Sequence, residues 1–236
     1  MIAYIYGYGF GAQWLALVGI PLIIGLIAQF RVHRAFKKWG AVRASSNITG
    51  AQAAREILAA AQIRDVEVVE TNDYLGDHYD PTSKRLCLSS NVYNTSSVAA
   101  LGIAAHETGH AIQHAAAYAP LKARMAVVPA TMMVSQFLPI IMFAGLFFHL
   151  LPWNITLNVV IIGYLVITVF QLITLPVEFD ASRRAKIILG EMGMVHSGEE
   201  AAGVNNVLNA AAMTYVAALV AAIGNLLYFV LLRNRN

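Results

Sequence analysis

The run MAVVPATMMVSQFLPIIMFAGLFFHLLPWNITLNVVIIGYLVITVFQLITLPV occupies residues 125–177 and contains no Asp, Glu, Lys or Arg. A helix of about 20 apolar residues crosses the hydrocarbon core of a bilayer, so this run is too long for one crossing. The Pro152-Trp153-Asn154 break divides it into two predicted spans, roughly residues 127–151 and 155–175, with Trp153 near the membrane interface. The sequence therefore predicts an integral membrane protein.

The rest of the composition supports this class of protein. Of the 236 residues, 58% are hydrophobic and only 12% are charged, whereas soluble domains carry about 25% charged residues. Residues 12–30 and 207–232 are two further apolar runs long enough to span a bilayer. A cleaved signal peptide explains the first run less well than a retained anchor, because its positive charges follow the apolar stretch. We expect four transmembrane helices.

The distribution of basic residues predicts the membrane topology. If both termini lie outside, all but two of the 16 Lys and Arg residues, Arg233 and Arg235, fall on the cytoplasmic side. This asymmetry places residues 31–126 and 176–206 in the cytoplasm, in a multi-pass protein of the plasma membrane. Since the basic residues cluster beside apolar spans, topology explains them, and the predicted partner is the lipid bilayer and not nucleic acid.

The cytoplasmic segments predict a small α+β part within a single membrane-embedded domain, residues 1–236. Residues 46–63 have the spacing of an amphipathic helix, with Thr49 as its cap. Residues 66–69 and 85–88 are expected to form the two strands of a short hairpin. An edge strand of this kind could hold an extended peptide by strand addition. The apolar run 98–117 follows as a helix, capped by Ser96 or Ser97. The expected fold is mainly α.

That last helix carries the sequence His106-Glu107-Thr108-Gly109-His110. On a helix the two histidines lie one turn apart, roughly 40° round and about 6 Å along the axis, so both can bind one metal ion. Glu107 can then reach a water in the open coordination position, as the general base of H-E-x-x-H hydrolases does. The alternative is a buried histidine pair with an unrelated acid. The single cysteine, Cys87, excludes a Cys-rich zinc site.

A catalytic zinc takes three protein ligands, so a third donor is required on the same side of the membrane. Glu178 is the best candidate, because a new helix after the third span could bring it to the motif helix. Asp180 competes for this role, but the favoured interpretation is that it hydrogen bonds a ligand histidine or pairs with Arg184 at i+4. A charge at the end of a span also has a simple topological explanation.

Several other polar residues are candidates for supporting roles. His114 lies too far along the helix from His106 to share one ion, so we assign it either to helix packing or to a hydrogen bond that supports the metal site from outside. The candidates for stabilising a reaction oxyanion are His78, Arg183, Arg184 and Tyr215. His78 could instead bind substrate, although turn residues alone explain its cluster, and tyrosines such as Tyr215 are common in membrane spans.

Five segments together match the pattern of a known family: residues 12–30, DHYDP (77–81), AAHETGHAIQ (104–113), PVEFDAS (176–182) and VLNAAAMTYVA (207–217). The chain resembles the bacterial membrane-bound neutral zinc metallopeptidases, and more distantly HtpX and the CAAX prenyl proteases. The resemblance implies a gluzincin-like site with one Zn²⁺, in which His106, His110 and Glu178 are ligands and Glu107 is the base. The distant relatives usually carry Asp four residues after the ligand Glu, where this chain has Ser182.

The predicted function is therefore hydrolysis of peptide or membrane-protein substrates by a zinc-activated water at the cytoplasmic membrane face. One alternative is a metal-binding membrane scaffold or regulator without catalytic activity. A weaker alternative is an ion transporter, since the four spans lack a continuous row of polar residues. The sequence specifies no oligomeric state.

Overall fold

The computed structural model describes residues 11–72, 76–146, 148–196 and 198–234. Its contacts divide the chain into two compact units. We call residues 1–28, 123–175 and 214–236 the helical unit, and residues 29–122 and 176–213 the mixed unit. The predicted placement of both termini falls on residues 1–10 and 235–236, which lie outside the described residues.

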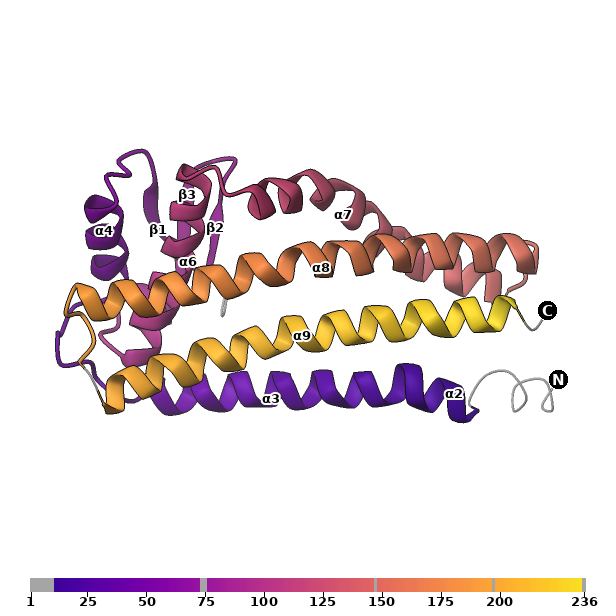
Figure 1. The fold of residues 1–236 in the computed structure, drawn as a ribbon, viewed down its shortest axis with the longest axis horizontal. Helices are drawn as coiled ribbons and strands as arrows, with labels where there is room; N and C mark the ends of the chain where they lie inside the picture. The colour runs from indigo at the N-terminus through magenta and orange to yellow at the C-terminus, as the bar shows by residue number, and fades with distance from the viewer. Residues whose placement is uncertain (1–10, 73–75, 147, 197, 235–236) are drawn as a thin grey trace. The chain divides into compact units, whose positions relative to one another are not determined.

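Four helices within the described residues are long and apolar enough to cross a membrane, which confirms the predicted fold class (Figure 1). They run over Ala12–Gly40, Ala119–Gly145, Trp153–Glu191 and Glu199–Arg233. The first consists of α2 (Ala12–Trp14), the π-helical turn η1 (Leu15–Gly19) and α3 (Ile20–Gly40). The other three are α7 (Ala119–Leu146), α8 (Trp153–Glu191) and α9 (Glu199–Arg233). The domain limits and membrane sides stay predictions.

The helical unit has a small buried cluster and a large exposed apolar surface. Its buried residues come from α7, α8 and α9, and the ring of Tyr164 stacks on Phe229 with 5.5 Å between centroids. Many large apolar side chains of the same helices are exposed, among them Met132, Phe143 and Ile162. A surface of this composition is stable in lipid, where no water must be excluded from it.

The third long helix differs from the prediction in one respect. We expected a new helix to begin after the third span, but α8 continues unbroken through Pro176 to Glu191. Breaking a helix in apolar surroundings leaves several backbone groups unpaired, which costs more than the single hydrogen bond that a proline removes. Glu178 is therefore positioned by the helix that contains the third span and not by a separate helix after it.

The mixed unit contains a three-stranded sheet with the order β1-β3-β2. The strands are β1 (Glu67–Thr71), β2 (His78–Asp80) and β3 (Arg85–Ser89). β2 and β3 form an antiparallel hairpin, whereas β1 pairs parallel to β3. The predicted pairing of residues 66–69 with 85–88 as a hairpin is therefore wrong, since the hairpin's first strand is β2. The Asp80 carboxylate closes the hairpin turn by accepting hydrogen bonds from Thr82 and Ser83, a turn chemistry that a three-residue strand leaves easy to overlook.

The predicted helix caps are present. In α4 (Gly50–Ala60), Thr49 and Gln52 form a reciprocal capping box, as expected of the amphipathic helix. The short helix α5 (Ser90–Tyr93) leads to α6 (Val98–Ala115), where the Ser97 side chain accepts a hydrogen bond from the Ala100 amide at 3.1 Å. Ser97, and not Ser96, is thus the cap of the motif helix.

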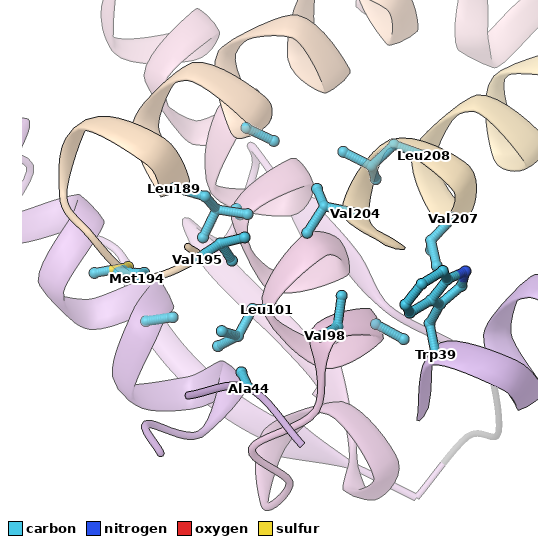
Figure 2. Close-up of a cluster of buried hydrophobic side chains, with 14 of the residues drawn as sticks. Trp39, Ala44, Val98, Leu101, Leu189, Met194, Val195, Val204, Val207 and Leu208 are labelled. Atoms are coloured by element: carbon cyan, nitrogen blue, oxygen red, sulfur yellow. The ribbon is translucent and has the colours of Figure 1, made fainter. Parts of the chain in front are cut away.

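α6 is the centre of the mixed unit. One of its faces packs with α4 and the sheet, where Ala100, Ala104 and Leu86 are fully buried. Another face contributes to a second cluster with the end of α3, the end of α8 and the start of α9 (Figure 2). Val98 and Leu101 from α6 lie in this cluster with Trp39, Val204 and Leu208. The motif helix is therefore held from several sides before any ligand is considered.

Candidate metal centre

Two helices of the mixed unit bring three potential ligands together. α6 carries His106 and His110, and α8 carries Glu178. The Glu178 Oε2 atom lies 3.2 Å from His106 Nε2 and 3.5 Å from His110 Nε2. One donor atom from each residue lies within 4.8 Å of the others. The imidazole rings are nearly perpendicular, at 83° with 4.8 Å between centroids. The three side chains converge on one point.

The far side of each imidazole is also paired. His106 Nδ1 lies 3.1 Å from the Ser182 hydroxyl, and His110 Nδ1 lies 3.0 Å from Oε1 of Gln113. Metal-binding histidines in proteins nearly always use their second nitrogen in a hydrogen bond of this kind. Residue 182, where the distant relatives usually carry Asp, is a serine in this chain. Its hydroxyl nevertheless contacts the same histidine, His106.

The structure separates the two acids that competed for the third position. Glu178 is almost completely buried and contacts both imidazoles. Asp180 instead accepts hydrogen bonds from Arg183, Arg184 and Gln113. The expected i+4 pair of Asp180 and Arg184 is present at 2.6 Å. In the described part of the chain, Asp180 is thus connected to a ligand histidine only through Gln113.

Glu107 lies next to His106 and is held by the sheet. Its Oε2 atom accepts a hydrogen bond from the backbone N–H of Tyr79 on β2 at 3.1 Å. β2 is an edge strand. The amide of Tyr79 on the open side of this strand already donates to Glu107, and the following Pro81 has no N–H that could donate to a peptide. Strand addition of a peptide at this edge, which stays a hypothesis, would have to share or displace the Glu107 contact.

The electrostatics of the centre reflect its concentration of carboxylates. Burial raises the pKa of Glu107, and the neighbouring imidazoles only partly oppose this effect. Burial by itself lowers the pKa of His110, but Glu178 and Glu107 outweigh it, and the net shift is upward. Both shifts mean that the site favours added positive charge.

The other candidates lie in several environments. Arg183 and Arg184 both pair with Asp180. His78 is exposed, and its Nδ1 contacts the Gly76 carbonyl at 2.7 Å. Tyr215 lies on α9 in the helical unit. The oxyanion role of all four residues stays a prediction.

His114 contacts the sheet, and the choice between its two predicted roles stays open. Its Nδ1 lies 2.8 Å from the Tyr79 hydroxyl. Tyr79 therefore contacts α6 at two points, Glu107 through its amide and His114 through its side chain.

Sequence reasoning missed two residues of the centre, Gln113 and Tyr79. Gln113 had a usable signal, because an amide three residues after His110 in an otherwise apolar stretch is costly to bury without a specific partner. Tyr79 had no such signal, since it acts on Glu107 through its backbone N–H, which every residue except proline possesses.

Comparison with known proteins identifies the family. The model of a family described as "Putative neutral zinc metallopeptidase" matches residues 14–234. The chain belongs to this family. A relative from Bacillus subtilis (strain 168), named "Putative membrane protease YugP", is 42% identical over 208 residues, which cover 87% of this chain and 89% of the relative. No solved structure matches the chain.

The centre of this metallopeptidase family member has the chemistry that zinc requires. Two imidazole nitrogens and one carboxylate oxygen form a donor set typical of catalytic zinc sites. Their spacing and the hydrogen bonds on both Nδ1 atoms fit a single cation. A buried carboxylate such as Glu178 is stable only when it is paired with positive charge or hydrogen-bond donors.

Proposed function

We propose that this protein is a zinc-dependent membrane endopeptidase that hydrolyses peptide bonds in peptide or membrane-protein substrates. The observation that carries the proposal is the convergence of His106, His110 and Glu178 within 4.8 Å, with Glu107 beside them on α6. Family membership and the protease name of the Bacillus relative support the same reaction class.

Each residue has a distinct role in this proposal. His106, His110 and Glu178 hold the ion. Bound zinc would lower the pKa of a coordinated water to about 7 and polarise the scissile carbonyl. Glu107 takes the proton of the attacking water and passes it to the leaving amine. Its Oε2 atom is held by the Tyr79 amide, which leaves Oε1 for this transfer.

We further propose that the reaction takes place at the cytoplasmic face of the plasma membrane, with both termini outside. This orientation is supported by the concentration of Lys and Arg in residues 31–126 and 176–206. Addition of impermeant cysteine reagents to intact cells that carry single-cysteine variants would test it. Labelling of an introduced cysteine near Lys84 from outside would contradict the proposed side.

The decisive experiment substitutes the base. The full-length protein, purified in detergent, is assayed with casein-like and membrane-protein substrates, and its zinc content is measured. Glu107→Gln should lower turnover by about 100- to 10,000-fold, the usual contribution of a general base, while zinc content stays unchanged. Glu56→Gln is the matched control, because Glu56 is an exposed acid on α4.

The other outcomes separate the alternatives. Turnover by Glu107→Gln at the rate of the unmodified protein would reject the role of Glu107. Stoichiometric zinc without cleavage of any substrate by the unmodified protein would favour the metal-binding scaffold. Ion flux in liposomes that depends on the same residues would favour a transporter.

A further inference from the structure

Gln113 connects the motif helix to the helix that carries Glu178. Its side chain is fully buried. Its Oε1 atom lies 3.0 Å from His110 Nδ1, and its Nε2 atom donates to the Val177 carbonyl and to Asp180 Oδ2, both at 2.9 Å. The amide thus uses both of its N–H groups on α8 and its oxygen on α6.

These partners determine which way the amide points. A carbonyl and a carboxylate only accept hydrogen bonds, so the NH₂ group of Gln113 must face Val177 and Asp180. The amide oxygen must then face His110. Because an amide oxygen also only accepts, Nδ1 of His110 must carry the proton. The lone pair of the ring is consequently on Nε2, the atom that points at Glu178.

The carboxylate of Asp180 is itself fixed. Arg183 and Arg184 donate to its two oxygens at 2.5 and 2.6 Å. The result is a chain of hydrogen bonds from the guanidinium groups through Asp180 and Gln113 to His110. Each hydrogen bond in this series has only one possible direction from donor to acceptor.

Within the described residues, the Nδ1 side of His106 has no equivalent constraint. Its Nδ1 contacts the Ser182 hydroxyl, which can donate as well as accept. A hydroxyl therefore does not select between the two neutral forms of the ring. The two histidines have equivalent places in the sequence motif, but their Nδ1 atoms have different hydrogen-bond partners.

We propose that Gln113 is a positioning residue that locks His110 in the tautomer that binds metal through Nε2, and so sets the zinc affinity of the centre. The proposal rests on the proposed zinc site. Loss of a hydrogen-bond partner behind a ligand histidine typically weakens metal binding by about 10- to 100-fold. We expect a loss in this range when Gln113 is removed, and a smaller loss for Ser182→Ala.

The test measures zinc affinity of the full-length protein in detergent by competition with a chromophoric chelator, together with the visible spectrum of the Co²⁺-loaded protein. Gln113→Leu removes the acceptor and should weaken zinc by about tenfold or more and alter the cobalt bands. Thr108→Val is the matched control. Thr108 is equally buried on α6, but among the residues that the structure describes its hydroxyl bonds only to the Ala104 carbonyl of the same helix.

A second variant separates positioning from folding. Gln113→Glu keeps an acceptor for His110 Nδ1 but places a carboxylate against Asp180, so we combine it with Asp180→Asn, which offers an amide donor at that point. The Val177 carbonyl loses its donor in this double variant as it does in Gln113→Leu, so the comparison of the two proteins isolates the acceptor for His110. This double variant should bind zinc more tightly than Gln113→Leu and recover the cobalt spectrum. A purely structural role predicts that both proteins lose zinc in proportion to their loss of thermal stability.

The proposal is overturned if Gln113→Leu binds zinc within about twofold of the unmodified protein and keeps its cobalt spectrum, or if the double variant shows no recovery. His110→Ala distinguishes this failure from a failure of the proposed function. Unchanged zinc affinity in His110→Ala would show that zinc binds elsewhere, which rejects the site itself. Weakened zinc binding in Gln113→Leu, in a protein that cleaves no peptide, would support the role of Gln113 while rejecting the peptidase.

Discussion

The helices α6 and α7 are both predominantly apolar, yet their side chains have opposite environments. α6 is buried over most of its length, and its buried positions are mainly Ala and Gly together with Val98 and Leu101. α7 exposes large side chains such as Met133, Phe137 and Ile140. Both sequences avoid water, but one helix is surrounded by protein and the other presents a surface suited to lipid.

This difference shows when an apolar helix can contain polar and charged side chains. Small residues on α6 let neighbouring backbones approach closely, as at Gly109, where an added Cβ would lie 3.0 Å from the Ala181 carbonyl oxygen. Close neighbours can satisfy polar groups, so α6 carries His106, Glu107 and His110 at low cost. From Met125 onward α7 has no Asp, Glu, Lys or Arg, as expected of a helix whose neighbours are lipid chains.

The largest effect is expected where α6 depends on α8 for its chemistry. Glu178→Ala removes the only carboxylate that contacts both imidazoles among the described residues. Loss of a hydrogen-bond partner behind a ligand lowers metal affinity by up to about 100-fold. Loss of a ligand itself should lower zinc affinity by more than this. Metal analysis after dialysis measures this. Asp180→Ala is the comparison variant and should lose much less zinc. Full zinc occupancy in Glu178→Ala, with loss in Asp180→Ala, would reverse the assignment of the two acids.

An intermediate effect is expected from truncating one apolar side chain in each helix. Leu101 of α6 is 0% exposed, whereas Met133 of α7 is 63% exposed. Leu101→Ala should leave a cavity and lower the free energy of unfolding by about 2–5 kcal/mol. Met133→Ala opens no cavity and should change it by only about 0.5 kcal/mol. Denaturant unfolding in mixed micelles measures both values, and equal losses would contradict the distinction between the two helices.

The smallest effect is expected from adding one methyl group to the α6 backbone. In Gly109→Ala the new Cβ meets Ala181 backbone atoms of α8, which cannot rotate away, so we expect a loss of about 1–3 kcal/mol in unfolding free energy. Gly25→Ala on α3 is the control, since no atom lies within 4 Å of its added Cβ. Thermal unfolding should rank Gly109→Ala below the unmodified protein and Gly25→Ala at or above it. The reverse ranking would mean that α6 and α8 do not pack as closely as described.

Much of this architecture was predictable because its signals are local. The four spans follow from length and composition, and the Thr49 cap of α4 and a serine cap of α6, at residue 96 or 97, follow from residue type at a helix start. The strand pairing was not predictable. β1 pairs parallel to β3 and β2 forms the antiparallel edge, but a strand of three residues such as β2 gives too short a pattern to recognise.

By itself, the sequence determined that the chain is a membrane protein with an H-E-x-x-H helix, since one turn of helix brings His106 and His110 together wherever that helix lies. Only the tertiary structure decided that Glu178 and not Asp180 meets them. Both acids lie more than 60 residues along the chain from the motif, and two positions on α8 separate them by about 200° of rotation. The same holds for the Tyr79 amide at Glu107. A backbone N–H has no residue-type signature, so its position follows only from how the sheet packs on α6.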